Sequence, residues 1–260
     1  MRFITSRLYS ILAVLAFTIS YLILLIPFLI IIPNPNWHKY TGPLNRIWAK
    51  LFFGLILMRV KVSYHPSIDK NGQYLFCPNH FSYLDIPSMG YTPGNFIFVG
   101  KNAMEKVPLF GYMYKKLHIT VNRASLKSKH STYVRSKEAI DNGKSLVMYP
   151  EGGVTTDNPP QMGGFKNGPF KLAIEKQIPI IPVTIPNNWI LLPDDDRFLL
   201  KWGTMHVVYH EPISTEGLNL NDLESLKDKV YSVIQSELDR QNENRQDNVS
   251  KHSTLSPAGI

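Results

Sequence analysis

A histidine and an aspartate five positions apart, His80 and Asp85, are the residues in this sequence best suited to proton-transfer chemistry. The apolar run before them predicts a buried strand that ends at the turn signal Pro78-Asn79. His80 then lies at the C-terminal end of a strand, where α/β folds bind ligands. Asp85 falls in the first turn of a following helix, close enough to accept a hydrogen bond from the imidazole and fix its tautomer. The spacing therefore predicts an oriented general base.

The same segment also has purely structural interpretations. Ser82 and Asp85 have the spacing of a capping box, so Asp85 can serve only to begin a helix, and a single histidine is often structural. Cys77 raises another alternative, a Cys–His nucleophile. Because Cys77 lies inside the apolar run and no third group is indicated, the sequence favours a buried thiol that behaves as a small hydrophobic residue.

Three further segments have residue types that suit a polar or phosphorylated substrate. Arg123 follows a short predicted strand, and its planar guanidinium fits a phosphate group, although it can equally be a surface arginine. Glu151 and Gly152 follow another strand, in a loop where the backbone can approach a ligand and Glu151 can bind hydroxyls or anchor basic groups. The alternative is an ordinary glycine-rich turn with an exposed acid. Lys166 offers a second phosphate contact, unless it is simply solvated.

Taken together, these segments resemble the signature blocks of the glycerolipid acyltransferases, typified by 1-acyl-sn-glycerol-3-phosphate acyltransferase. Four blocks occur in the family's order across about residues 74–185, which is far more specific than one block alone. They are Asn79–Asp85, Leu117–Arg123, Tyr149–Gly152 with the following Phe165–Gly168, and Ile178–Val183.

The resemblance implies a reaction and a role for each residue. An acyl chain would pass from an acyl-CoA or acyl carrier protein thioester to the free hydroxyl of a lysophospholipid, most simply 1-acyl-sn-glycerol-3-phosphate, giving phosphatidic acid. His80 would act as the base and Asp85 would hold the imidazole, with no metal and no cofactor other than the thioester co-substrate. Arg123 and Lys166 would bind the head group, and Glu151 with Gly152 would position the glycerol.

The chain departs from the family pattern beside the acceptor-binding blocks. Asn122 stands where the family usually has aspartate, and Leu117 where it has glycine. Gly153 and Val154 replace a Thr or Ser that is often followed by Arg. Since His80 and Asp85 are intact, these departures bear on acceptor recognition. They leave open a different lysolipid, such as a lyso-amino-acid lipid.

Composition and charge narrow the class of partner. Hydrophobic residues make up 44% of the chain and charged residues 18%, which predicts a well-developed core and excludes global disorder. The net charge of +8 calls for an acidic partner, and residues 101–144 hold ten Lys or Arg against three acids. The sequence has no zinc-finger spacing, RNP-like strand or basic zipper, which favours a membrane or a phosphate over nucleic acid.

The N-terminal residues predict a membrane motif. Residues 11–32 are uncharged and apolar over a length that can cross a bilayer core of about 30 Å, longer than the apolar region of a signal peptide. A second apolar stretch at 44–60, with basic residues near its edges, predicts an interfacial helix. Basic residues flank the first stretch on both sides, so we expect a hairpin with both ends, and the active site, at the cytoplasmic face. These flanking residues are Arg2, Arg7, Lys39 and Arg46.

The remaining chain predicts an α/β domain over residues 61–240, with a mixed, largely parallel sheet flanked by helices and preceded by the two-helix motif of residues 1–60. The expected strands are 60–64, 74–77, 96–99, 119–121, 145–149, 180–185 and 205–209. The expected helices lie near 84–90, 113–117, 131–141, 169–176 and 222–238. Residues 241–260 are polar and lack periodicity, which predicts a disordered tail.

Overall fold

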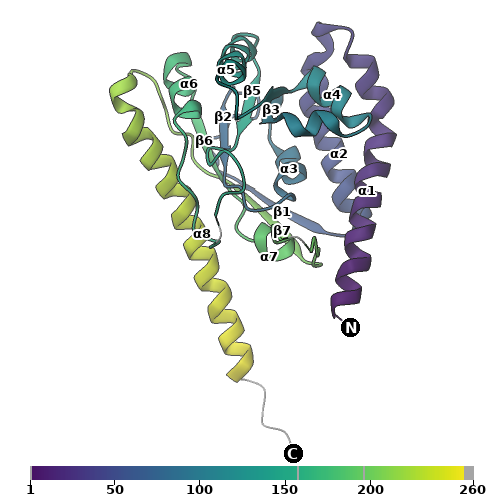
Figure 1. The fold of residues 1–260 in the computed structure, drawn as a ribbon. Coiled ribbons are helices and arrows are strands. Elements are labelled where there is room, and N and C mark those ends of the chain that lie inside the picture. The colour runs from purple at the N-terminus through teal and green to yellow at the C-terminus, as the bar shows by residue number, and fades with distance from the viewer. Residues whose placement is uncertain (1, 157, 196, 255–260) are drawn as a thin grey trace, which may run out of the picture.

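The computed structural model describes residues 2–156, 158–195 and 197–254, and its centre is a seven-stranded sheet (Figure 1). The strand order is β1-β7-β6-β2-β5-β3-β4. Neighbouring strands are parallel except β6 and β7. The predicted α/β class with a mixed, largely parallel sheet is confirmed, and all seven expected strands are present. They are β1 (Arg59–Tyr64), β2 (Leu75–Pro78), β3 (Phe96–Lys101), β4 (Ile119–Val121), β5 (Ser145–Met148), β6 (Ile180–Thr184) and β7 (Thr204–Tyr209).

Helices cover both faces of the sheet (Figure 1). One face carries α1 (Arg2–Ile31), α2 (Thr41–Leu55) and α4 (Phe110–Leu117), and the other carries α5 (Leu126–Asp141), α6 (Gly168–Lys176) and α8 (Leu223–Thr254). Short helices α3 (Asp85–Ser88) and α7 (Asn188–Leu191) follow β2 and β6. The described residues also contain four short 3-10 helices. They are η1 (Pro35–Tyr40), η2 (Met89–Tyr91), η3 (Asn102–Lys106) and η4 (Leu220–Asp222).

Strand β2 lies in the middle of the sheet, and its sequence explains why. Its four residues are all buried, as expected for a strand covered on both faces. Successive side chains alternate, so Phe76 packs with the aromatic residues under α1 and α2, while Leu75 and Cys77 pack under α6 and α8. The strand that delivers His80 is therefore fixed by two separate hydrophobic cores.

The first two helices pack side by side (Figure 1). Phe17 of α1 meets Trp48 of α2 edge to face, with 5.3 Å between ring centroids. The outer face of α1 exposes large apolar side chains along its length, such as Leu8 and Ile26. Helix α1 is long and apolar enough to span a bilayer. The membrane hairpin, its same-face flanks and the division of the chain at residue 60 stay predictions.

The predicted disordered tail is wrong for residues 241–254, which continue α8 to Thr254; residues 255–260 lie outside the described residues. Between Gly217 and Pro257 the sequence contains neither glycine nor proline, so nothing in it stops the helix. The extension is also held by a side-chain contact, since the Arg245 guanidinium lies 4.9 Å from the ring centroid of Trp189. Apolar residues do not recur at helical spacing in this segment because this part of the helix has no buried face.

Substitutions at the exposed Asn244 test whether residues 241–254 form a helix or a disordered tail in solution. Asn244→Pro should reduce the helical circular-dichroism signal at 222 nm, because proline inside a helix costs about 3 kcal/mol relative to alanine. The matched variant Asn244→Ala should keep or increase the signal. Identical spectra for the two variants would show that residues 241–254 are not helical in solution.

Candidate active site

The turn after β2 is anchored before it reaches the histidine. The Asn79 side chain spans to the end of the neighbouring strand β6, where its Oδ1 accepts from Ile185 N at 2.7 Å and its Nδ2 donates to Ile185 O at 3.2 Å. Asn79 is fully buried. This pair of bonds fixes the backbone one residue before His80, so the imidazole starts from a rigid position.

The His80 imidazole is held by the carboxylate of Asp85, as the spacing predicts. His80 Nδ1 lies 2.9 Å from Asp85 Oδ2. The same oxygen accepts the backbone N–H groups of Phe81 at 2.9 Å and Ser82 at 3.0 Å, and Asn188 Nδ2 donates to the other oxygen, Oδ1. Since every partner of the carboxylate is a donor, Nδ1 carries the proton and Nε2 is left to accept one from a substrate.

The capping box predicted for Ser82 and Asp85 does not form, because the N-cap of α3 is Leu84 without a side-chain cap bond and the Ser82 hydroxyl donates to Leu192 O. The carboxylate still closes the turn before α3. The Asp85 carboxylate accepts the Ser82 N–H, and Asp85 N donates to Ser82 O at 3.2 Å. One fully buried carboxylate thus closes the turn that begins α3 and orients the imidazole.

The imidazole is also restricted by an aromatic ring. The rings of His80 and Tyr149 stack with 4.2 Å between centroids and an interplanar angle of 29°. The His80 side chain keeps 15% exposure. One face of the ring is therefore covered by Tyr149, and the side chain remains partly exposed.

Glu151 is a buried positioning group in this structure, with 1% exposure. Its Oε1 accepts His80 N at 2.8 Å and its Oε2 accepts Gly163 N at 2.9 Å. Burial raises the pKa of Glu151 to about 7, opposed by these two backbone N–H groups. The carboxylate thereby ties the end of β2 to the loop after β5. A contact between Glu151 and substrate glycerol stays a prediction.

The two predicted cations lie beside the glycines that follow Glu151. Gly152 has φ of +81°, and a β-carbon there would lie 3.5 Å from Cγ of Lys166. A β-carbon on Gly153 would lie 3.1 Å from Nη1 of Arg123. Both cationic side chains are exposed. The structure thus brings all six predicted site residues to one edge of the sheet, while their roles toward substrate stay predictions.

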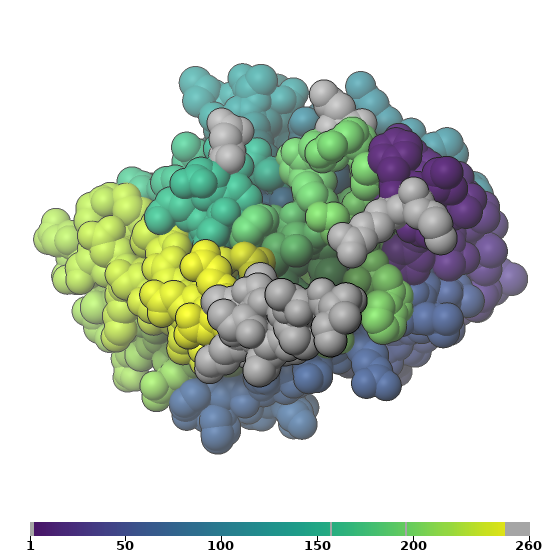
Figure 2. Space-filling view, turned by 90° about the horizontal axis from the view of Figure 1, so that it is seen from below, coloured from purple at the N-terminus to yellow at the C-terminus, as the bar shows by residue number. Residues whose placement is uncertain are grey.

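Hollows open at this edge of the sheet, and Figure 2 shows the surface between α1, the green segment near residue 200 and α8. A cavity of about 430 Å³ is lined by residues that include Phe81, Val154 and Trp189. An apolar groove of about 270 Å³ runs between α1 and α3, and its walls include Tyr83 and Leu84, which lie between His80 and Asp85 in the sequence. The cavity and the groove therefore adjoin the segment Phe81–Leu84, which follows His80 in the chain.

Sequence reasoning missed the contributions of Asn79, Tyr149 and Asn188. Asn188 carried a usable signal, because it follows β6 in the turn sequence Pro186-Asn187-Asn188, at the same edge as His80. Recognising it also requires that β6 pairs directly with β2, which comes from the strand order. The alternative nucleophile Cys77 is fully buried and free, and burial raises the pKa of its thiol, so the core interpretation holds.

An imidazole base oriented by a buried carboxylate, at the C-terminal edge of a largely parallel sheet, defines an α/β enzyme built for proton abstraction. Residues 59–186 match the Acyltransferase family model, so this part of the chain is an acyltransferase domain.

Relatives and a solved structure agree with this assignment. A chloroplastic 1-acyl-sn-glycerol-3-phosphate acyltransferase of Arabidopsis thaliana is 25% identical over 190 residues, covering 72% of this chain and 52% of that protein. The chain thus spans about half the length of that relative. The lyso-ornithine lipid O-acyltransferase of Pseudomonas aeruginosa is 27% identical over 207 residues, covering 74% of this chain and 78% of that protein. The crystal structure of the 1-acyl-sn-glycerophosphate acyltransferase of Thermotoga maritima shares the fold, with a TM-score of 0.74, 21% identity, and coverage of 93% of this chain and 98% of that chain.

The raised pKa of Glu151 predicts a pH-dependent contribution to stability. Because the folded pKa of about 7 exceeds the ordinary 4.5, the contribution is fully present below the unfolded pKa and is lost as pH rises through the folded pKa. The unfolding free energy of the wild type relative to Glu151→Gln should therefore fall from about pH 5 to about pH 8, by up to about 3 kcal/mol. Denaturant unfolding across this range checks it, with the exposed Glu216→Gln as control. A difference that does not vary with pH would contradict the raised pKa.

Proposed function

We propose that this protein transfers a fatty acyl chain from an acyl-CoA or acyl carrier protein thioester to the free hydroxyl of 1-acyl-sn-glycerol-3-phosphate, forming phosphatidic acid. The observation that carries the proposal is the hydrogen-bonded His80–Asp85 pair within an acyltransferase domain. The activities for which the Arabidopsis relative and the Thermotoga enzyme are named support this acceptor.

The proposed reaction follows from the one open nitrogen of the imidazole. His80 Nε2 takes the proton of the acceptor hydroxyl as that oxygen attacks the thioester carbonyl carbon. The carbon–sulfur bond breaks, and the leaving thiolate recovers the proton from the imidazolium, so the products are an ester and a thiol. Asp85 stabilises the imidazolium while Tyr149 limits its rotation. The step requires no metal, no further cofactor and no covalent acyl-enzyme.

The acceptor head group is assigned to the exposed cations beside the glycine loop. Arg123 and Lys166 lie against Gly153 and Gly152, where a phosphate would meet one planar guanidinium and one ammonium group. In this proposal Glu151 acts on the glycerol indirectly. Both of its oxygens already accept backbone N–H groups, so Glu151 holds the backbone of His80 and thereby sets where the imidazole meets the glycerol hydroxyl.

The acyl chains are assigned to the apolar side of the site. The groove between α1 and α3 reaches Tyr83 and Leu84, so a chain lying in it would end beside the imidazole. Exposed apolar residues along α1 continue this surface outward, as expected for a helix that contacts membrane lipids. The proposed setting is a membrane surface, with the site open to the cytoplasm, where soluble thioester donors are available.

A second acceptor class is favoured by one local observation. Gly153 stands where the family usually has a Thr or Ser, and the Arg123 guanidinium lies where that side chain would begin, 3.1 Å from the position of a β-carbon. A site with fewer hydroxyl donors suits a lysolipid without a phosphate monoester. The Pseudomonas relative acts, by its name, on lyso-ornithine lipid, which makes a lyso-amino-acid lipid the alternative acceptor.

We expect His80→Ala to abolish acyl transfer while thermal stability stays near that of the wild type, since the imidazole is partly exposed at the end of the strand. A general base contributes about 10²–10⁴-fold, so labelled acyl donor and lysolipid would show the loss clearly. His130→Ala, at an exposed position of α5, should keep wild-type turnover. Substantial residual turnover in His80→Ala would remove His80 from the mechanism.

The acceptor assignment predicts a selective effect at Arg123. Arg123→Ala should lower kcat/KM for 1-acyl-sn-glycerol-3-phosphate by about 10–100-fold, because a charge-assisted contact is lost, while the KM for the thioester donor stays unchanged. Arg123→Lys should recover only part of the loss, because an ammonium group lacks the guanidinium fork. Lys127→Ala removes a neighbouring exposed cation and should have no effect.

Two other results at Arg123 would change the assignment. A higher KM for the donor with unchanged acceptor dependence would place Arg123 at the donor's phosphates. No effect on either substrate would make Arg123 a surface charge. Activity of the wild type on a lyso-amino-acid lipid in preference to the phosphate acceptor would then establish the alternative.

A further inference from the structure

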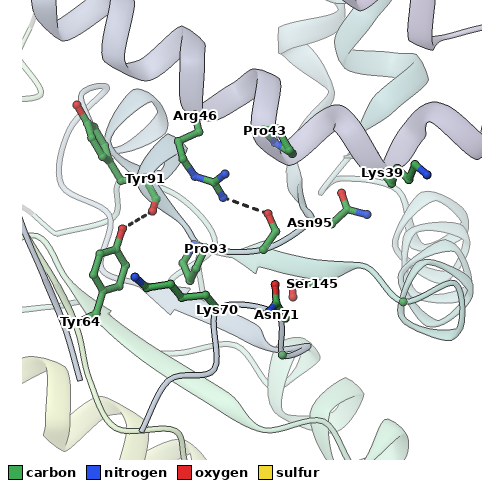
Figure 3. Close-up of a pocket in the computed structure, with 13 residues that line it drawn as sticks. Lys39, Pro43, Arg46, Tyr64, Lys70, Asn71, Tyr91, Pro93, Asn95 and Ser145 are labelled. Atoms are coloured by element: carbon green, nitrogen blue, oxygen red, sulfur yellow. Dashed lines mark hydrogen bonds between the residues drawn. The ribbon is translucent and has the colours of Figure 1, made fainter. Parts of the chain in front are cut away.

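A second polar cavity lies at the opposite edge of the sheet from His80 (Figure 3). Its volume is about 630 Å³, within the range of about 300–1,000 Å³ typical of ligand sites. It is lined by residues at or just before the first residues of β2, β3 and β5, such as Lys70, Asn95 and Ser145, together with the first turns of α2. Since His80 follows the C-terminal end of β2, the sheet separates this cavity from the active site.

The cavity is lined by cations that come from different elements. Lys39 precedes α2, Arg46 lies on α2, and Lys70 lies in the loop before β2 (Figure 3). None of the described residues that line it is acidic. The nearest acid in the sequence, Asp69, uses Oδ1 to accept the backbone N–H of Asn71. The described wall of this cavity is therefore positively charged.

Arg46 is fixed on the cavity wall rather than loosely solvated. Its Nη2 donates to Thr92 O at 2.8 Å and Gly94 O at 3.1 Å. The remaining N–H groups of its guanidinium have no hydrogen-bond partner among the described residues. A guanidinium immobilised through one nitrogen presents the others to a ligand without a further loss of side-chain freedom.

Uncharged groups on the wall suit a ligand that also carries hydroxyls. Ser145 is 2% exposed, and its hydroxyl oxygen accepts Tyr74 N at 3.0 Å, so its own proton remains to be donated. Asn95 also lines the cavity and adds a further uncharged polar side chain to its wall.

We propose that this cavity binds a glycerophosphate group, with the phosphate at the Arg46 guanidinium and with Lys39 and Lys70 elsewhere on the wall as further sources of positive charge. Two phosphate oxygens can meet the fork of the fixed guanidinium, and a wall with cations and no described acid favours an anionic ligand. A thioester donor is a poor occupant, because its reactive carbon must reach His80 at the other edge of the sheet.

The position of the cavity gives the ligand two possible sources with the same chemistry. Trp37 and Tyr40 are exposed in η1 beside Lys39, and such aromatic side chains favour the membrane–water interface. A head group of phosphatidylglycerol can therefore enter from a membrane, and free sn-glycerol 3-phosphate can enter from solution. Both carry glycerol esterified to phosphate, as a phosphodiester with one negative charge in the lipid and as a more highly charged phosphate monoester in the soluble compound.

Residue-resolved lysine modification tests the site without relying on activity. The full chain in neutral detergent is treated with an acetylating reagent, and peptide mass spectrometry measures the rate at each lysine. We expect sn-glycerol 3-phosphate, at a concentration that fills about 90% of the sites, to slow acetylation of Lys39 and Lys70 about tenfold. The reason is that only about a tenth of the sites are then free to react. Lys229, exposed on α8, should be unaffected and serves as the internal control.

Vesicles distinguish the two sources. Phosphatidylcholine vesicles containing phosphatidylglycerol should protect Lys39 and Lys70 if the lipid head group binds, and protection by the soluble ester alone would assign the site to the free metabolite. Equal protection by pure phosphatidylcholine would overturn the proposal, because covering of the surface by lipid would explain it. Absence of protection by every probe would also overturn it and leave the lysines as solvated side chains.

A matched pair of double variants supplies the independent measurement. Lys39→Gln with Lys70→Gln removes two exposed cations and leaves Arg46 on its carbonyl partners, so the fold should be retained. The affinity of this double variant should fall at least about tenfold for whichever ligand protects the wild type. Equilibrium binding measures it for sn-glycerol 3-phosphate, and vesicle flotation measures it for phosphatidylglycerol. Lys129→Gln with Lys229→Gln removes the same charge from α5 and α8 and should bind as the wild type does. Equal affinity of both double variants would overturn the proposal.

Discussion

The buried carboxylate of Asp85 is the constraint on which the active site depends. A fully buried carboxylate is costly unless hydrogen-bond donors replace the water it has lost. Four donors do so here: the His80 imidazole, two backbone N–H groups in the turn after β2, and the side chain of Asn188. Two backbone N–H groups and Asn188 satisfy the carboxylate within the fold, and its remaining acceptor capacity orients the imidazole, so the group that closes the turn also fixes the tautomer of His80.

A second buried carboxylate, Glu151, fixes the backbone of the residue whose side chain Asp85 holds. The two acids are close enough that the charge of Asp85 helps to raise the pKa of Glu151. Desolvation contributes most to this increase, and it is opposed by the two backbone N–H groups and by the His80 imidazole. His80 is thus held through side chain and main chain by separate groups, which makes its position independent of any single loop.

The sequence predicts those features that depend on neighbours in the chain. Strand positions, the His80–Asp85 spacing and the turn after β2 all follow from local patterns, and the structure contains them. Asn188 and the buried role of Glu151 depend on which strands lie side by side, and β6 meets β2 across about a hundred residues of sequence. The helical residues 241–254 were missed for a different reason, since a polar helix without a buried face lacks the periodicity that distinguishes it from a tail.

The geometry of the loop after β5 explains what one departure from the family pattern, Gly153, does to its neighbour Arg123. At Gly153 a β-carbon would lie 3.1 Å from Arg123 Nη1, a tight contact, so a larger side chain there requires the guanidinium to shift. The glycine therefore does more than remove a hydroxyl, because it also permits the present position of Arg123 against the loop. A Thr or Ser at this position would trade that placement for a second donor to the head group. The proposed acceptor specificity thus depends on residue 153 and Arg123 jointly, and their effects on binding should not be additive because the two positions are in contact.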